Sequence, residues 1–371
     1  MNNESNHTQL LRKILHKEAN GKTIWQPRID CWYWDRVFRG EELQGRFKGA
    51  SELELYNLLG VSNRLYMFNS CIEKTYDDPS VVEEIREIDD MKTEHTIKTP
   101  VGTVSSILSK NTSNYGQMPI KWWVEEPEDF EAFMFIEEHT NYRFNQETYD
   151  KLLAEWGHLG LPGTFLPRVN MQRLMLDLCG VENTYYLMSD CPDVFDAYIE
   201  TLNRSQMRMI EMMCDTPFEW INYGDNIHSK LISPTLFEKY IIPAYQQRNE
   251  TLQKAGKFTY AHFDGDVKEL LPYFHECHFN GIEAITPLPQ GDVTLKEARD
   301  AMEGLVLIDG VSAILFDERY PLEMLKQQTE ECLELFEGQL VLGISDEISS
   351  TGTLDRVEYV TEIVENFNAK R

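Results

Sequence analysis

The chain has 371 residues, of which 42% are hydrophobic, and a formal net charge of −27 at pH 7. This length and hydrophobic content suit one large α/β barrel with a sizeable core. The negative charge argues against nucleic acid and anionic membranes as partners, because the field around the protein would repel phosphate.

Cysteine usage and the N-terminal region indicate the compartment. The seven cysteines are scattered, odd in number and without a Cys-x-x-Cys pair, which is typical of reduced thiols in a cytoplasmic protein. Residues 1–22 are polar and amphipathic, without the apolar stretch of a secretion signal, and no run in the chain is apolar enough to span a bilayer. We expect one domain over 1–371, with residues 1–22 as a helical N-terminal extension.

The first half of the chain gives only a few clear signals. Residues 23–40 predict an opening strand followed by a loop, and residues 99–110 predict a β-hairpin insertion. Acidic residues at the start of 125–139 favour a helix, and residues 189–214 predict a long helix.

The second half alternates between strand-like and helix-like stretches, five of each, with short connections. The expected strands cover 218–227, 257–266, 281–289, 304–311 and 338–347, and the expected helices cover 233–256, 267–280, 294–303, 320–337 and 353–370. The strands are continuous apolar runs, as a parallel sheet covered on both faces requires. This pattern favours a (β/α)8 TIM barrel, with a doubly wound open sheet as the alternative. No Gly-x-Gly-x-x-Gly follows a strand, which weakens a dinucleotide-binding interpretation.

Polar side chains gather where these strands end, which is where the chemistry of a parallel barrel lies. They are Asn222, Tyr223, Asp225, Asn226, His262, Asp264, Glu283, Asp309, Ser345, Asp346 and Glu347. Each alone could be a helix cap or the first polar residue of a loop. His262 and Asp264 are two residues apart, so an extended backbone points both to the same side, and Glu283 lies on the next strand. A histidine with carboxylates predicts a divalent metal site, with Zn²⁺ as the first choice. The group His275-x-Cys277-His278 falls on an expected helix, where such spacing spreads the side chains apart, so we interpret it as structural.

Aromatic residues follow the expected first strand. We predict that Trp32 or Trp34 lines a pocket for a flat or aromatic ligand at the barrel mouth. Anchoring of the N-terminal extension is the alternative role for these aromatics.

The strand-end motifs resemble the uroporphyrinogen decarboxylase superfamily, which includes corrinoid-dependent methyltransferases. The similarity runs through "INYGDNIHSKLISPTLFEKYIIPAYQQ", "AHFDGD", "GIEAITPLPQGDVTLKEA", "VLIDGV" and "LVLGISDEI", with "KWWVEEPEDFEAF" as the best match in the first half. The family fold is a single (β/α)8 barrel. The decarboxylase itself carries an arginine-rich segment near its N-terminus, whereas "RIDCWYWDRVF" holds only Arg28 and Arg36, so decarboxylation is disfavoured.

The methyltransferase branch carries a His-x-Cys zinc motif on the fifth strand and a cysteine after the eighth. His262 matches the first position, but Asp264 stands where the thiol would be and "GISDE" has no cysteine. The resemblance therefore implies an oxygen-rich zinc site made by His262, Glu283 and Asp346. Asp264, Asp225 and Tyr223 would act as catalytic groups that orient the substrate or donate a proton, and Trp32, Trp34 and Asn226 would bind substrate.

The implied function is that of the methyltransferase component of an O-demethylase. A methyl group would pass from a methoxylated, aromatic substrate to the cobalt of a corrinoid carried by a partner protein. The alternatives are a decarboxylase-like lyase and a non-catalytic ligand-binding barrel. The methyl donor and the oligomeric state stay open, with a homodimer among the alternatives.

Overall fold

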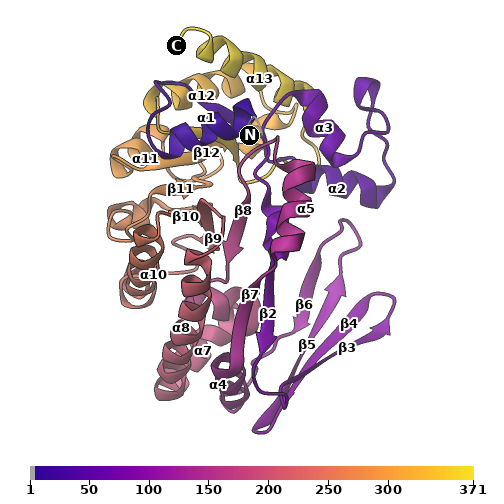
Figure 1. The fold of residues 1–371 in the computed structure, drawn as a ribbon, viewed down its shortest axis with the longest axis vertical. Helices are drawn as coiled ribbons and strands as arrows, with labels where there is room; N and C mark the ends of the chain where they lie inside the picture. The colour runs from indigo at the N-terminus through magenta and orange to yellow at the C-terminus, as the bar shows by residue number, and fades with distance from the viewer. Residues whose placement is uncertain (1–4) are drawn as a thin grey trace.

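A parallel seven-stranded sheet forms the centre of the computed structural model, which describes residues 5–371 (Figure 1). Its strands run in the order β1-β13-β12-β11-β10-β9-β8, and each neighbouring pair is parallel. Their bounds are β1 Ile24–Gln26, β8 Gly163–Leu166, β9 Trp220–Ile227, β10 Phe258–Phe263, β11 Gly281–Glu283, β12 Val306–Ser312 and β13 Leu340–Ser345. All five strands expected in the second half are present as neighbours in this sheet, although β11 covers only the first part of the expected strand 281–289.

The sheet does not close into the eight-stranded barrel that the sequence predicts. Its edge strands β1 and β8 do not pair with each other within residues 5–371. The irregular segment 61–65 lies between these edges: Ser62 N donates to Trp25 O (3.2 Å), and Asn63 N donates to Leu159 O (3.0 Å). This segment lies where the missing strand would be, but it makes too few backbone hydrogen bonds to be a strand. The observed fold is an α/β half-barrel that is open at this seam.

Helices cover the outer face of the sheet, as the alternation in the sequence predicts. They are α8 Pro192–Cys214, α10 Ile242–Lys254, α11 Leu295–Ala301, α12 Leu322–Leu335 and α13 Leu354–Asn368. The helix expected over 267–280 is reduced to the short 3-10 helix η5 Lys268–Tyr273, which has Pro272 inside it. Proline removes a backbone donor and clashes with the preceding turn, so this stretch cannot hold a regular α-helix.

An insertion of antiparallel strands extends from one side of the molecule (Figure 1). Its four-stranded sheet comprises β3 Val82–Asp89, β4 Lys92–Thr99, β5 Gly102–Lys110 and β6 Gln117–Lys121, and β2 Ile72–Tyr76 pairs with β7 Thr140–Phe144. The expected hairpin corresponds to part of this sheet. Further helices in the first half of the chain are α3 Glu52–Leu59, α4 Asp129–His139, α5 Gln146–Trp156, α6 Asn170–Arg173 and α7 Val181–Asp190.

The N-terminal helix α1, Asn6–Leu15, closes the end of the barrel where the strands begin. Leu11 and Ile14 are fully buried in one cluster with Trp220, Tyr260 and Val341 from the sheet. The expected extension 1–22 thus contributes to the core, although its first four residues lie outside the described part of the chain. Among residues 5–371, no helix combines the length and the apolar character that a membrane crossing needs.

The stretch after β1 is the helix α2, Asp30–Arg39, and not the loop that the sequence predicts. Gly40 ends this helix in a left-handed conformation (φ 68°), which glycine adopts without strain. The helix carries Trp32 inward, where it is buried, and leaves Trp34 45% exposed. Aromatic residues are weak helix formers, so their density hid the helix in the sequence.

Candidate active site

A cavity of about 610 Å³ opens at the carboxyl ends of the strands. Its lining residues are Arg28, Cys31, Phe165, Leu166, Pro167, Arg168, Arg173, Asp177, Gly224, Asn226, His262, Asp346 and Glu347. The lining brings together one imidazole, three carboxylates and three guanidinium groups. A cavity of this size at this end of a parallel sheet is the usual place for a small-molecule site.

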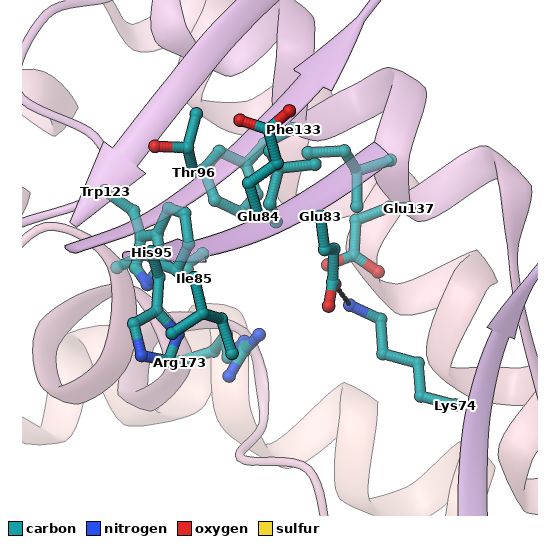
Figure 2. A pocket seen from close by; sticks show the side chains of 13 residues that line it. Lys74, Glu83, Glu84, Ile85, His95, Thr96, Trp123, Phe133, Glu137 and Arg173 are labelled. Carbon is teal, nitrogen blue, oxygen red and sulfur yellow. Dashed lines mark ion pairs between the residues drawn. The ribbon is translucent and has the colours of Figure 1, made fainter. Parts of the chain in front are cut away.

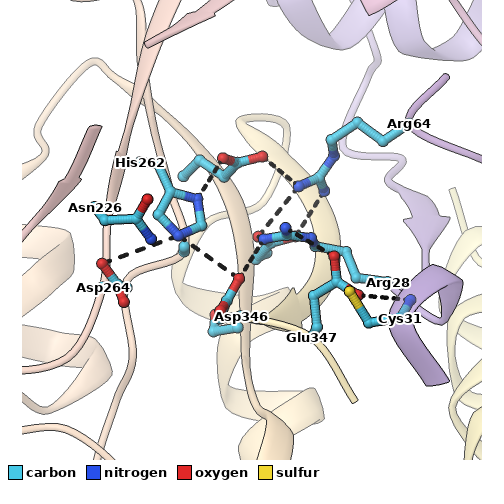
Figure 3. A network of polar contacts seen from close by, with 12 residues as sticks. Arg28, Cys31, Arg64, Asn226, His262, Asp264, Asp346 and Glu347 are labelled. Atoms are coloured by element: carbon cyan, nitrogen blue, oxygen red, sulfur yellow. Dashed lines mark hydrogen bonds and ion pairs between the residues drawn. The ribbon is translucent and has the colours of Figure 1, made fainter. Parts of the chain in front are cut away.

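His262, Asp264 and Asp346 converge at the wall of the cavity (Figure 3). His262 Nε2 lies 4.0 Å from Asp264 Oδ1 and 3.6 Å from Asp346 Oδ1. His262 Nε2 and Asp264 Oδ1 are buried, and neither has a hydrogen-bond partner among residues 5–371. Burial raises the pKa of Asp264, because removal from water disfavours its charged form.

Glu283 holds the imidazole from behind. Alternation along β10 points Tyr260 and His262 into the barrel, and His262 Nδ1 donates to Glu283 Oε2 at 2.7 Å. Because a carboxylate only accepts, this bond places the proton of the neutral ring on Nδ1 and leaves its Nε2 lone pair facing the cavity. Burial lowers the pKa of His262, but the bond to Glu283 outweighs it, so the pKa is raised.

Arg64 neutralises the buried acids beneath His262. Its Nη1 lies 2.6 Å from Glu283 Oε1 and its Nη2 lies 2.6 Å from Asp309 Oδ1, and all three side chains are almost completely buried. Asn222 Nδ2 also donates to Glu283 Oε2 at 2.8 Å. Burial alone would raise the pKa of Glu283, but Arg64 and His262 overcome it and hold that pKa well below its usual range. Glu283 is therefore an anion that already has four partners, Tyr66 included.

Arg28 fixes the segment that follows β13. Its Nη1 lies 2.8 Å from Asp346 Oδ1, and its Nη2 lies 3.2 Å from Glu347 Oε1 (Figure 3). Glu347 also accepts from the backbone N–H of Cys31 at 3.1 Å. Arg28 thereby links the start of α2 to Asp346, and its charge offsets part of the acid cluster.

Gly343 is required by this arrangement. A Cβ at residue 343 would collide with the Asp309 carboxylate and would lie 3.0 Å from Gln26 O and 3.1 Å from Arg64 Nη2. We expect Gly343→Ala to lower the free energy of unfolding by about 1–3 kcal/mol, the usual effect of overpacking. Urea denaturation measures this change. Gly102→Ala is the control, because its Cβ would meet only Ala132 Cβ at 3.5 Å, and an equal loss in both variants would contradict the expectation.

Two of the three predicted metal ligands belong to the group that could hold an ion, and the third, Glu283, lies behind His262. His262 and Asp346 line the cavity, and Asp264, which the sequence assigns to catalysis instead, joins them in the group that could hold a metal. Glu283, predicted as a ligand, is directed at His262 and Arg64. Its oxygens are already occupied, so it supports the imidazole and is not part of the group that could take an ion.

Tyr223 and Asp225, predicted as catalytic, lie on the outer face of β9. Tyr223 packs against Tyr245 and Phe279, with ring centroids 5.3 Å away in both cases. Asp225 accepts from Tyr245 Oη (2.5 Å) and from Val169 N (2.8 Å) and is fully buried. Neighbouring strand residues point to opposite faces, so these odd-numbered residues turn away from the barrel interior that holds Asn222.

Of the predicted substrate-binding residues, Asn226 lines the cavity and the two tryptophans do not. Trp32 Nε1 donates to Gly352 O at 2.8 Å, and its ring lines a separate cavity of about 520 Å³. Trp34 Nε1 reaches Glu52 Oε2 at 3.2 Å near the surface. Because α2 is a helix, it carries both rings away from the mouth, and Phe165 is the aromatic residue in the lining.

Sequence reasoning missed the cations of the site. Arg64 comes from the irregular segment 61–65, and Arg168 and Arg173 follow β8, a strand that the sequence analysis did not identify. The available signal was "GTFLPR", a short apolar run that ends in proline and arginine. Arg28 was noted only for the absence of an arginine-rich pattern around it.

The residues present fit a divalent metal ion. His262 Nε2 and one oxygen from each of Asp264 and Asp346 lie within 4.8 Å of one another. A neutral imidazole, whose other nitrogen is bonded to a carboxylate, is a common metal ligand, and the two buried atoms without partners are the donors such an ion would satisfy. The group could hold a metal by nitrogen and oxygen donors, with the cavity side open.

Comparison with known proteins gives one family match. Residues 173–367, more than half of the chain, match the model of the family described as "Uroporphyrinogen decarboxylase (URO-D)". No curated protein matches the chain.

Among solved structures, a methyltransferase from Methanosarcina mazei is similar at a TM-score of 0.58 and 15% identity, over 98% of this chain and 99% of that chain. A putative vitamin-B12-independent methionine synthase from Listeria monocytogenes gives a TM-score of 0.40 at 15% identity, over 60% of this chain and 70% of that chain. The Methanosarcina likeness extends over both whole chains and establishes a common fold.

Proposed function

This chain belongs to the uroporphyrinogen decarboxylase (URO-D) family, and from that premise we propose that it is a metal-assisted methyltransferase. It would move a methyl group from a methoxylated substrate to the cobalt of a corrinoid on a separate protein. The group His262, Asp264 and Asp346 at the cavity wall carries this proposal. The Methanosarcina protein, described as a methyltransferase, supports the reaction class.

The chain's own residues would prepare the leaving group. His262, Asp264 and Asp346 would hold the ion, for which we propose Zn²⁺, while Glu283 fixes the imidazole and Arg28 fixes Asp346. The bound ion would supply a Lewis acid that stabilises negative charge on the departing oxygen. Asn226 on the cavity wall would orient the substrate.

The transfer balances as a displacement at carbon. Cobalt(I) of the partner's corrinoid attacks the methyl carbon, the carbon–oxygen bond breaks, and its electron pair stays with the oxygen. The cobalt is oxidised formally to cobalt(III), and the demethylated product leaves as an alkoxide or phenoxide that takes a proton from solvent. The cavity lies at the strand ends, so we propose that the corrinoid protein docks there.

Metal binding combined with methyl transfer tests the proposal. The purified chain should bind about one Zn²⁺, measured by calorimetry and elemental analysis, and should methylate free cob(I)alamin from at least one member of a methoxyarene panel, followed by its absorption spectrum. Activity should disappear with a chelator and return with zinc. Full activity in metal-free protein would refute the role of the metal, and no transfer from any donor in zinc-loaded protein would refute the reaction.

Glu283→Gln should weaken zinc binding by roughly 10- to 100-fold, the usual effect of losing a group that orients a ligand. The amide keeps the shape but can donate to His262 Nδ1, which would disturb the tautomer that leaves Nε2 free. Calorimetric titration measures the change. Asp300→Asn, an exposed acid bonded to Lys296, serves as the control. An unchanged affinity in Glu283→Gln would contradict the supporting role.

A decarboxylase-like lyase is the second candidate, favoured by the three arginines of the cavity, Arg28, Arg168 and Arg173, which could hold carboxylates. Incubation with uroporphyrinogen separates the two functions. Release of carbon dioxide that continues after the metal is removed would favour the lyase. Methyl transfer with no release of carbon dioxide would favour the methyltransferase.

A further inference from the structure

We propose that Arg168 and Arg173 bind an oxyanion of the substrate, so that the methyl donor is a carboxylate, sulfonate or phosphonate with its methoxy group at the other end. This inference rests on the proposed methyl transfer and adds the chemical class of its substrate. It replaces the expectation of an aromatic pocket made by Trp32 or Trp34, because neither ring lines the cavity.

The two arginines form one cationic unit on the side of the cavity next to β8. Arg168 Nη1 lies 2.8 Å from Asp177 Oδ1, and Arg173 Nη1 lies 3.0 Å from Asp177 Oδ2. One carboxylate therefore bridges two guanidinium groups, which leaves an excess positive charge at the cavity surface. All three side chains line the cavity and stay partly accessible, at 22–31% exposure.

Both guanidinium groups keep donors for a ligand. Arg168 Nη2 donates to Asn226 Oδ1 at 3.1 Å, while its Nε is buried without a hydrogen-bond partner in the described chain. The side chain of Arg173 donates only to Asp177 within residues 5–371. A guanidinium fork held at a fixed orientation suits the paired oxygens of a carboxylate, sulfonate or phosphonate.

Acidic side chains behind Arg173 compensate part of this positive charge from the side away from the substrate cavity. Arg173 also borders a smaller cavity of about 130 Å³ beneath the four-stranded sheet, which it shares with Glu137 and Lys74 (Figure 2). Glu137 acts on both Arg173 and Lys74, and Lys74 also pairs with Glu83 at 3.7 Å (Figure 2), so Glu137 offsets part of the charge of Arg173. Burial lowers the pKa of Arg173, but Asp177 and Glu137 outweigh it, and Arg173 stays charged.

The side chains at the two ends of the cavity carry opposite charges. The group of His262, Asp264 and Asp346 has two carboxylates and is suited to bind a cation. Arg168 and Arg173 are suited to bind an anion. Asn226 stands between these two groups, bonded to Arg168 and lining the same space. A substrate anchored by its oxyanion at the arginines would extend its far end toward the metal-binding group. Such anchoring limits the orientations in which the methoxy group can react.

Matched ligands test the inference by calorimetry, with zinc-loaded and with chelator-treated protein. The probes are 4-methoxybenzoate, 4-methoxybenzenesulfonate and 4-methoxyphenylphosphonate, with neutral 4-methoxybenzamide as the isostere. At least one anion should bind more tightly than the amide, and Arg168→Gln should reduce that preference by roughly 10- to 100-fold, the effect of losing hydrogen bonds to a charged group. Arg168→Lys should retain part of it, and Arg173→Gln should act in the same direction.

Arg86→Gln is the control, because Arg86 is an exposed cation paired with Glu94 on the four-stranded sheet. Equal binding of anion and amide, no binding of any probe, or an unchanged preference in folded Arg168→Gln and Arg173→Gln would overturn the inference. Anion preference without methyl transfer would support it while refuting the proposed reaction. Methyl transfer from the amide at the same kcat/KM as from the anions would support the reaction while refuting the inference.

Discussion

Replacing Arg64 with methionine should lower the free energy of unfolding by about 3–5 kcal/mol, because it leaves buried Glu283 and Asp309 without their shared cation. The melting temperature should fall on the order of 10 °C. Methionine keeps much of the length of the side chain, so the loss reports on charge more than on packing. Chemical denaturation followed by circular dichroism measures it.

Two further variants make this prediction specific. Arg86→Met removes an exposed ion pair with Glu94 and should change stability by no more than about 1 kcal/mol. Adding Glu283→Gln to Arg64→Met removes one of the two unpaired buried charges and should recover part of the lost free energy of unfolding. A double-mutant cycle quantifies this coupling. Equal effects of Arg64→Met and Arg86→Met would show that the buried acids do not depend on Arg64.

His262→Ala should abolish methyl transfer and weaken zinc binding by more than about 100-fold. This effect is larger than the one expected for Glu283→Gln, because His262 is itself a proposed ligand and Glu283 only orients it. The fold should persist, because Glu283 keeps Arg64, Asn222 and Tyr66 as partners. Zinc calorimetry and the cob(I)alamin assay measure the two effects.

The control is His275→Ala, which removes an exposed imidazole from the group His275-x-Cys277-His278. Zinc binding and activity should not change in that variant. A loss in His275→Ala together with none in folded His262→Ala would move the metal site to this second group and contradict the assignment.

The second half of the fold could be predicted because its strands are continuous apolar runs buried on both faces, and its helices carry clear end signals. Ser233 accepts from Leu236 N, and Thr294 forms a capping box with Glu297. The seam could not be predicted, because residues 61–65 are held by a few long-range hydrogen bonds that leave no periodic pattern. The same is true of α2, in which packing overrides the weak helix propensity of its aromatics.

Some residues of the candidate site could also be predicted from the sequence, and others could not. His262, Asp264 and Asp346 could be placed at the strand ends, where parallel strands bring distant residues together. Tyr223 and Asp225 were misplaced because a shift of one residue along a strand reverses the face. The roles of Glu283 and Arg64 could not be read from the sequence, because a buried acid looks the same whether its partner is a metal or a guanidinium.

The open seam also shapes how the molecule can loosen. A strand is usually held by a ladder of backbone hydrogen bonds, but residues 61–65 are held by a few hydrogen bonds of Ser62 and Asn63 together with the ion pairs of Arg64. Movement of this segment would pull Arg64 away from two fully buried acids, Glu283 on β11 and Asp309 on β12. The ion pairs of Arg64 therefore resist opening at the seam, and the same residue stabilises Glu283, which holds the imidazole of His262.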